Sequence, residues 1–202
     1  MTKAYISLPH LKAASFAAAS EETRYYLCGV SVTIDARGST YVATDGRILF
    51  ACRHELPDGE PDNTLLGSWI VPTKFCDPFK LRKRDPDVFA ILTSDSAEPA
   101  PRLTLTQDDN AVTFSPIDGS FPDWRRVLPS KVKPDCGGRT FDTRLLLTLE
   151  KAGKALGLTA FVWAPNGGNP APVQYGDDNL ALGMIMPTRV GRDAPFSRPS
   201  WA

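Results

Sequence analysis

The sequence predicts an α+β fold made of three repeated units, each containing a strand, a helix and three further strands. Three times a short strand runs into a helical stretch, near Pro9, near Pro72 and near Asp142. Each helical stretch is followed by β-branched and aromatic runs between polar turns, which is typical of antiparallel strands. With 202 residues, 42% of them hydrophobic, the chain can bury a substantial core.

The first unit begins with a strand at Ala4–Leu8 and an alanine-rich helix at Pro9–Ser20, because proline is tolerated in the first helical turn. On this helix His10 and Lys12 are expected to face outward. A strand is predicted at 24–34. A strand pair bent at Asp45–Gly46 follows within Val42–Phe50, since these two residues suit a tight turn.

The second unit repeats this order 63 residues later, counted from Pro9 to Pro72 (72 − 9 = 63). A strand at Ser68–Val71 leads into a helical stretch from Thr73, which Pro78 interrupts and which ends in the basic run Lys80–Arg84. Three strands are predicted after it, at Val88–Thr93, Arg102–Thr106 and Ala111–Ser115.

The third unit has the clearest helix of the chain, Arg144–Leu156, preceded by a short strand at Arg139–Phe141 and an N-cap at Asp142 or Thr143. Helical spacing places four apolar residues on one face of this helix: Leu145, Leu149, Ala152 and Leu156. Strands are predicted at Ala160–Trp163, Val173–Tyr175 and Leu180–Met186. The residues after Val190 form an unstructured tail.

Composition argues against several functional classes. Lys plus Arg and Asp plus Glu both number 23, so attraction to nucleic acid must come from local clusters of charge. Four separated cysteines and two histidines lack the spacing of a zinc site, and no cofactor is expected. No apolar run is long enough to span a membrane, which predicts a soluble cytoplasmic protein. No acid, base and nucleophile are placed together, so we expect no enzyme.

Five segments resemble, in the same order, motifs of the bacterial DNA polymerase III β sliding clamp family, the processivity subunit of the replicative polymerase. They are R-Y-Y-L-C-G-V at 24–30, V-A-T-D-G-R-I-L at 42–49, I-V-P-T-K at 70–74, G-S-F-P-D-W-R-R-V-L-P at 119–129 and M-I-M-P-T-R-V at 184–190. The resemblance implies the DNA clamp fold, with helices packed on antiparallel sheets. It also implies a truncated form, as from a phage or another mobile element.

The resemblance implies one and a half clamp domains. Residues 1–130 resemble the family's complete middle domain, 131–190 resemble the second half of its C-terminal domain, and 191–202 form a C-terminal tail. Family members have three domains of two units each and close into a dimeric ring around duplex DNA. A homo-oligomer is therefore expected here, and four chains of three units would supply the twelve units of such a ring.

The resemblance also implies a hydrophobic groove that binds short peptides of polymerases and clamp loaders. The matching positions are Leu27, Thr44, Gly46, Arg47, Ile48, Leu49, Pro122, Arg126, Val127, Met184, Ile185, Met186, Pro187, Thr188 and Arg189. Leucine, valine and methionine would accept apolar peptide anchors. Two positions depart from the family: Ile48 lacks the usual arginine, and Thr188 replaces a methionine. Taken alone, the T-D-G bend would be an ordinary turn, and Met186-Pro187 would be core.

Basic residues on the helices are expected to face DNA through sequence-independent phosphate contacts. They are Lys12, Lys74, Lys80, Arg82, Lys83, Arg84, Arg144, Lys151 and Lys154. The predicted function is a DNA sliding clamp for replication that tethers partner proteins to duplex DNA. An alternative is a binding module that does not encircle DNA and competes for clamp-binding partners. For the 80–84 run, a solvated helix face is an equally good interpretation.

Overall fold

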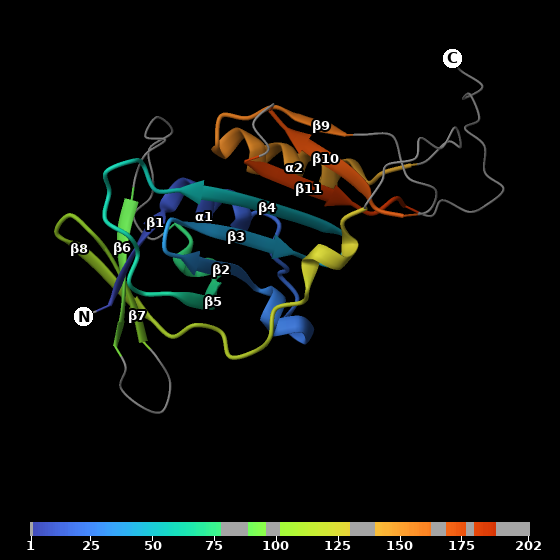
Figure 1. Ribbon diagram of the computed structural model, residues 1–202. Helices are drawn as coiled ribbons and strands as arrows, with labels where there is room; N and C mark the ends of the chain where they lie inside the picture. The colour runs from blue at the N-terminus through green and yellow to red at the C-terminus, as the bar shows by residue number, and fades with distance from the viewer. Residues whose placement is uncertain are drawn as a thin grey trace, which may run out of the picture.

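A computed structural model of the chain describes residues 2–77, 89–95, 102–129, 140–162, 169–176 and 180–188. Two antiparallel sheets make up most of it (Figure 1). A four-stranded sheet has the order β1-β6-β7-β8, and a seven-stranded sheet has the order β5-β2-β3-β4-β11-β10-β9. No helix in these ranges has the length and apolar content of a membrane span.

The strands of the four-stranded sheet are β1 (Lys3–Ser7), β6 (Phe89–Asp95), β7 (Arg102–Gln107) and β8 (Asn110–Phe114). Those of the seven-stranded sheet are β2 (Gly29–Asp35), β3 (Gly38–Thr44), β4 (Ile48–Glu55), β5 (Gly67–Pro72), β9 (Ala160–Val162), β10 (Ala171–Tyr175) and β11 (Ala181–Ile185). The predicted strands after each helical stretch are therefore present, and the predicted α+β architecture with antiparallel sheets is confirmed.

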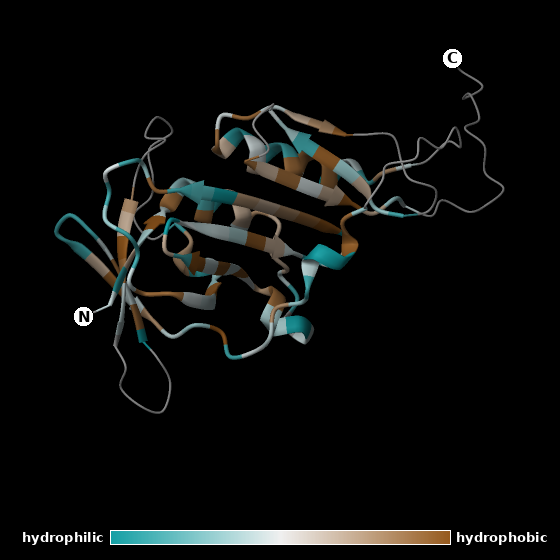
Figure 2. Cartoon of the chain, viewed as in Figure 1, coloured by the Kyte–Doolittle hydropathy of each residue, from teal (hydrophilic) through white to brown (hydrophobic). Residues whose placement is uncertain are grey.

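Two α-helices, α1 (Leu8–Ser15) and α2 (Thr143–Ala155), lie side by side on one face of the seven-stranded sheet (Figure 1). Helix α2 follows its prediction closely because Asp142 caps it, accepting a hydrogen bond from the backbone N–H of Arg144 at 2.9 Å. Its apolar side packs on the core, where Leu149 and Ala152 are buried. Figure 2 shows the hydrophobic residues of strands and helices alternating with polar ones, as this packing requires.

The main core lies between the helices and both sheets. Its largest fully buried side chains are Tyr41, Tyr175, Phe50, Ile6, Leu8, Leu11, Leu92, Leu103, Leu105, Leu149, Ile185 and Val30. Tyr41 also links the sheets by polar contact, because its hydroxyl accepts a hydrogen bond from the Ser7 backbone N–H at 2.8 Å. Burial raises the pKa of Tyr41 far above its usual value, so this hydroxyl stays neutral.

Four expectations for the elements were wrong. The first helix, α1, ends at Ser15, before the predicted end at Ser20. The segment 22–27 forms a 3-10 helix, η1 (Glu22–Leu27), in place of the start of a strand. His10 does not face outward: its ring contacts those of Tyr41 and His54, and its Nδ1 lies 2.7 Å from Ser7 Oγ. The strand predicted at 139–141 is reduced, within the described residues, to a single bridge between Thr140 and Thr188.

The second helical stretch is described only at its start, where η2 (Thr73–Phe75) forms one 3-10 turn. The remainder of the predicted helix, including Pro78 and the basic run 80–84, lies outside the described residues, as does the tail after Val190.

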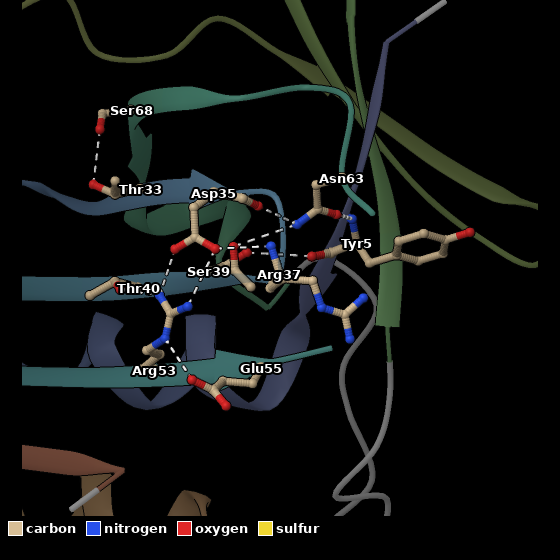
Figure 3. Close-up of polar contacts among 11 residues, drawn as sticks. Tyr5, Thr33, Asp35, Arg37, Ser39, Thr40, Arg53, Glu55, Asn63 and Ser68 are labelled. Carbon is tan, nitrogen blue, oxygen red and sulfur yellow. Dashed lines mark hydrogen bonds and ion pairs between the residues drawn. The ribbon is translucent and has the colours of Figure 1, made fainter. Parts of the chain in front are cut away.

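A network of polar side chains joins β1, β2, β3, β4 and the loop 56–66 (Figure 3). Arg53 pairs with Asp35 at 2.7 Å and with Glu55 at 3.2 Å. Hydrogen bonds from Arg53 are the largest cause that lowers the pKa of Asp35. The buried Asn63 accepts a hydrogen bond from the Tyr5 N–H and donates one to the Asp35 carbonyl, both at 2.9 Å. This amide connects the two sheets.

Candidate peptide-binding site

The site is organised around the turn Asp45–Arg47 between β3 and β4. The Asp45 carboxylate accepts hydrogen bonds from the N–H groups of Arg47, at 2.7 Å, and Ile48, at 2.8 Å. Thr44 Oγ1 accepts from the Gly46 N–H at 3.0 Å and donates to the Ile48 carbonyl at 2.6 Å. These bonds hold the turn in one conformation.

The backbone of this turn favours glycine at position 46. The φ of Gly46, 88°, lies in the left-handed region, which residues with a Cβ adopt rarely. The guanidinium of Arg24, a residue of η1, lies close by, because a Cβ built on Gly46 would be 2.9 Å from its Nη1. This contact could not be predicted from the sequence.

Pairing of β4 with β11 brings distant parts of the chain to this turn. Leu49 lies opposite Met184, and Ile48 opposite Ile185, in antiparallel register. Just beyond, the Met186 N–H donates to the Arg47 carbonyl at 2.8 Å. The 44–49 and 184–188 segments, which the prediction assigns to one groove, are therefore neighbours in the fold.

An apolar cluster lies on the outer face of the seven-stranded sheet, away from the helices. Its buried members are Val42, Leu49, Ala51 and Met184. The segment containing η3 (Trp124–Val127) covers them, contributing the partly buried side chains of Phe121, Trp124 and Leu128. The Arg125 guanidinium stacks 4.6 Å from the centroid of the Trp124 ring. Phe121 and Trp124 were not in the predicted set, since only the fold shows that they cover Leu49 and Met184.

The predicted groove residues differ in exposure. Leu27, Ile48, Leu49, Met184 and Ile185 are buried, and Thr44 and Pro187 are half-buried. Gly46, Arg47, Pro122, Arg126, Val127, Met186 and Thr188 are exposed. Ile48 and Ile185 belong to the main core beneath the sheet, so their side chains face away from the outer surface. Arg189 lies outside the described residues.

Exposed apolar atoms at the site come mainly from two side chains. Met186 is 40% exposed and Val127 is 45% exposed. The same segments carry two exposed cations, Arg47 in the turn and Arg126 in η3, and Arg126 pairs with Asp123 at 3.2 Å. Exposed apolar side chains on segments that also carry cations suit an extended peptide with apolar anchors and an acidic residue.

A hollow of about 660 Å³ is lined by the 116–125 segment and by residues of β2 and β5. Its floor includes Ser31 and Thr33 of β2 and Ser68 of β5, and its wall includes Phe121 and Trp124. Of the predicted groove residues it contains Pro122 alone. This hollow is therefore a feature separate from the predicted groove, sharing one wall with it.

The predicted DNA-facing residues are largely paired with acids where the structure describes them. Lys12 contacts Asp77 at 2.7 Å, Arg144 contacts Asp142 at 2.9 Å, and Lys154 contacts Glu150 at 2.7 Å. Lys151 and Lys74 are exposed, and Lys74 lies 4.9 Å from the Phe75 ring centroid. Lys80, Arg82, Lys83 and Arg84 lie outside the described residues.

The described part of the chain holds no group of three or more potential metal ligands. Its three cysteines, Cys28, Cys52 and Cys76, are free thiols. Burial raises the pKa values of the Cys52 and Cys76 thiols well above their usual value, so both stay protonated and unreactive at neutral pH.

The fold and the site together define a clamp-type protein: paired antiparallel sheets, helices on one face, and a strand junction with an exposed apolar site on the other. A model of the DNA polymerase III beta subunit, central domain, matches residues 9–123, more than half of the chain. The chain therefore belongs to the DNA polymerase III beta subunit family.

Relatives and solved structures agree with this assignment. The beta sliding clamps of Pseudomonas putida and Caulobacter vibrioides are 30% and 34% identical to this chain over 57% and 56% of its length. These matches span only 29% and 30% of the two relatives. The crystal structure of the C. crescentus beta sliding clamp superposes on 94% of this chain, with a TM-score of 0.72 and 20% identity, and the match covers 66% of that clamp.

Proposed function

We propose that this chain is a sliding-clamp protein without catalysis of its own, which tethers replication proteins to duplex DNA through the groove at the β4–β11 junction. The observation that carries the proposal is the pairing of β4 with β11, which sets the Asp45–Arg47 turn beside Met186. Family membership supplies the expected partners, namely duplex DNA and the peptides of polymerases and clamp loaders. The assembly is a homo-oligomer.

The domain division supports this proposal. Residues 1–130 form the whole four-stranded sheet and the strands β5, β2, β3 and β4 of the other sheet. They also include the whole region that the family model matches, as a complete clamp domain would. The described part of residues 131–190 contributes α2 and the strands β9, β10 and β11, the content expected of half a domain. These three strands continue the sheet of the first domain, because β11 pairs with β4. One side of the proposed groove therefore comes from the first domain and the other from the half domain.

A peptide-binding measurement tests the groove. An extended hexapeptide with leucine and phenylalanine anchors, labelled with a fluorophore, should bind the full chain. The Met186→Ala variant should bind it more weakly by more than ~1 kcal/mol, because an exposed anchor contact is lost. Fluorescence polarisation gives both dissociation constants.

Leu66→Ala is the matched control, since Leu66 is an exposed apolar residue in the loop before β5, away from the groove. It should bind the peptide as the wild type does. Equal affinity of the wild-type and Met186→Ala proteins would place the peptide site elsewhere. Leu49→Ala is a poorer probe than Met186→Ala, because Leu49 is buried under Trp124 and its truncation also destabilises the fold.

The ion pairs on the helices favour a second candidate function. Three of the described cations proposed to face DNA are paired with acids, which reduces the local charge available to phosphates. A clamp-like binding module that keeps the groove but does not encircle DNA would need no such charge. Retention on circular DNA distinguishes the two: a closed clamp stays on a nicked circle and slides off after linearisation, whereas the module shows no retention.

A further inference from the structure

The hollow of about 660 Å³ that β2, β5 and the 116–125 segment line, called here the β2–β5 hollow, has the size of a binding site. Ligand sites have volumes of ~300–1,000 Å³. The 116–125 segment passes from β8 alongside β5 and β2 to η3 (Figure 1). All of the chain that forms the hollow, 28–35, 66–72 and 115–128, is described, so its shape does not depend on other parts of the chain.

The floor of the β2–β5 hollow is polar. Ser31 lies opposite Val42 in the β2–β3 pairing, so its side chain is on the same outer face as the apolar cluster under Trp124. Two residues further along β2, Thr33 points the same way, and its Oγ1 lies 2.9 Å from Ser68 Oγ on β5 (Figure 3). Thr33 and Ser68 are exposed, and each hydroxyl can also bond to a ligand.

The walls of the hollow are aromatic and held in place. Phe121 and Trp124 line it from the 116–125 segment, and both are half-buried. At one end of the segment the Ile117 N–H donates to the Ile70 carbonyl at 2.8 Å. Towards the other end Phe121 and Trp124 pack on the apolar cluster. The hollow is therefore preformed. Aromatic walls over a hydroxyl floor suit a ring that carries a polar group, as in tyrosine.

Charge at the hollow differs from charge at the groove. The hollow is lined by the carboxylates of Asp118 and Asp123 and by one cation, Arg125, which leaves an excess of one acid. The groove segments carry the exposed cations Arg47 and Arg126. A partner segment that crosses both surfaces is best matched when it has an acidic residue near its groove anchors and a basic residue at the hollow.

The hollow also continues the surface of the groove. Pro122 lines the hollow and is one of the predicted groove residues. Across the sheet, Met184 of β11 lies three strands away from Ser31 of β2 and two residues further along. With about 4.8 Å between strands and about 3.3 Å per residue, the two are roughly 16 Å apart, a distance that about five extended residues span.

We propose that the β2–β5 hollow is a second contact site for the partner proteins, which takes a tyrosine with a lysine or arginine beside it. This tyrosine lies in the segment that flanks the groove-bound peptide. The inference rests on the proposed function, because it adds a site for the partner that the groove holds. The groove would supply the apolar anchor contacts, and the hollow would select among partners by the residues that flank their anchors.

Fluorescence polarisation with extended peptides tests the proposal. Each peptide carries the leucine and phenylalanine anchors of the hexapeptide and, after a Gly-Ser spacer of about six residues, either Tyr-Lys or Ala-Ala. The extension is placed at the amino end in one pair and at the carboxyl end in the other. Because a peptide has one direction in the groove, one Tyr-Lys peptide should bind at least ~5-fold more tightly than its Ala-Ala counterpart. No gain at either end overturns the proposal.

Variants of the floor assign this gain to the hollow. Thr33→Trp fills the floor and should abolish the gain, and Thr33→Val, which removes only the hydroxyl, should lower the affinity of the Tyr-Lys peptide roughly 2-fold or more. Thr113→Trp is the matched control, because Thr113 is an exposed strand threonine whose hydroxyl also lies 2.9 Å from a cross-strand hydroxyl, that of Thr104. It should keep the whole gain. A gain that both Thr33 variants leave unchanged overturns the proposal.

Failure of this inference is distinguishable from failure of the proposed function. Met186→Ala should weaken the hexapeptide and the extended peptides alike, because all of them use the groove. Thr33→Trp should weaken only the Tyr-Lys peptide. A chain that binds the hexapeptide and gains nothing from Tyr-Lys would refute the second site and leave the groove standing. A chain that binds no hexapeptide would refute the groove itself.

Discussion

Protonation of His10 should make this protein less stable in mild acid. The His10 ring lies between Tyr41 and His54, with centroid distances of 5.9 and 5.2 Å, and its Nδ1 is 2.7 Å from Ser7 Oγ. Burial, and secondly the charge of His54, lowers the pKa of His10 from 6.5 to about 4. The native state therefore keeps this imidazole neutral in a range where an unfolded chain would protonate it.

The sign and size of the effect follow from that shift. Between pH 6.5 and about 4 the unfolded state binds the proton and the folded state does not, so the free energy of unfolding decreases as the pH falls. Below about pH 4 both states are protonated at His10, and its contribution levels off. Lowering the pKa of His10 from 6.5 to about 4 corresponds to about 3 kcal/mol, at 1.36 kcal/mol per pKa unit.

Urea denaturation at intervals between pH 7.5 and 4.5, followed by far-UV circular dichroism, measures this dependence. His10→Gln keeps a polar group near Ser7 but cannot titrate, so its free energy of unfolding should change much less over the same range. His54→Gln should retain most of the slope, because burial is the larger cause of the His10 shift. A slope that survives in His10→Gln and disappears in His54→Gln would refute the assignment to His10.

Two further predictions concern the sheet connection and the DNA-facing residues. Asn63→Ala leaves the partly buried Tyr5 N–H and Asp35 carbonyl without their partner, so urea denaturation should show a loss of about 2–4 kcal/mol in the free energy of unfolding. Asn110→Ala, at the exposed β7–β8 turn, is the control and should lose less than ~0.5 kcal/mol. If the chain binds duplex DNA, Lys151→Ala should lower the slope of log affinity against log salt by about 1, whereas Lys12→Ala, whose ammonium already pairs with Asp77, should change it little; equal effects would contradict this assignment of free charge.

Strands with a clear alternation of buried and exposed residues could be predicted from the sequence, and so could α2, whose apolar face recurs at helical spacing. The segment 22–27 could not, because the tyrosines that favour a strand also fit a 3-10 turn, and Tyr25 is 56% exposed. The inward orientation of His10 could not be predicted from the spacing of apolar residues either. In an alanine-rich helix little distinguishes one face from another, and contacts with Tyr41 and His54 decide the matter.

The candidate site shows a similar limit. The turn at Asp45–Gly46 follows from residue chemistry, because Asp45 supplies the acceptor and Gly46 the positive φ. Strand geometry limits the rest of the predicted set, since neighbouring residues point to opposite faces of a sheet. Leu49 thus faces outward and Ile48 inward, although the family positions include both. Coverage by Trp124 depends on tertiary contacts across more than 70 residues and had no local signal.

The third unit connects peptide binding to the stability of the fold. A peptide that contacts both the Arg47 side and Met186 binds only when β11 is paired with β4, so it stabilises the junction by mass action. Strands β10 and β9 continue the sheet from β11. Peptide binding should therefore also slow amide hydrogen exchange in β10 and β9, to the extent that these strands open together with β11 in the free chain.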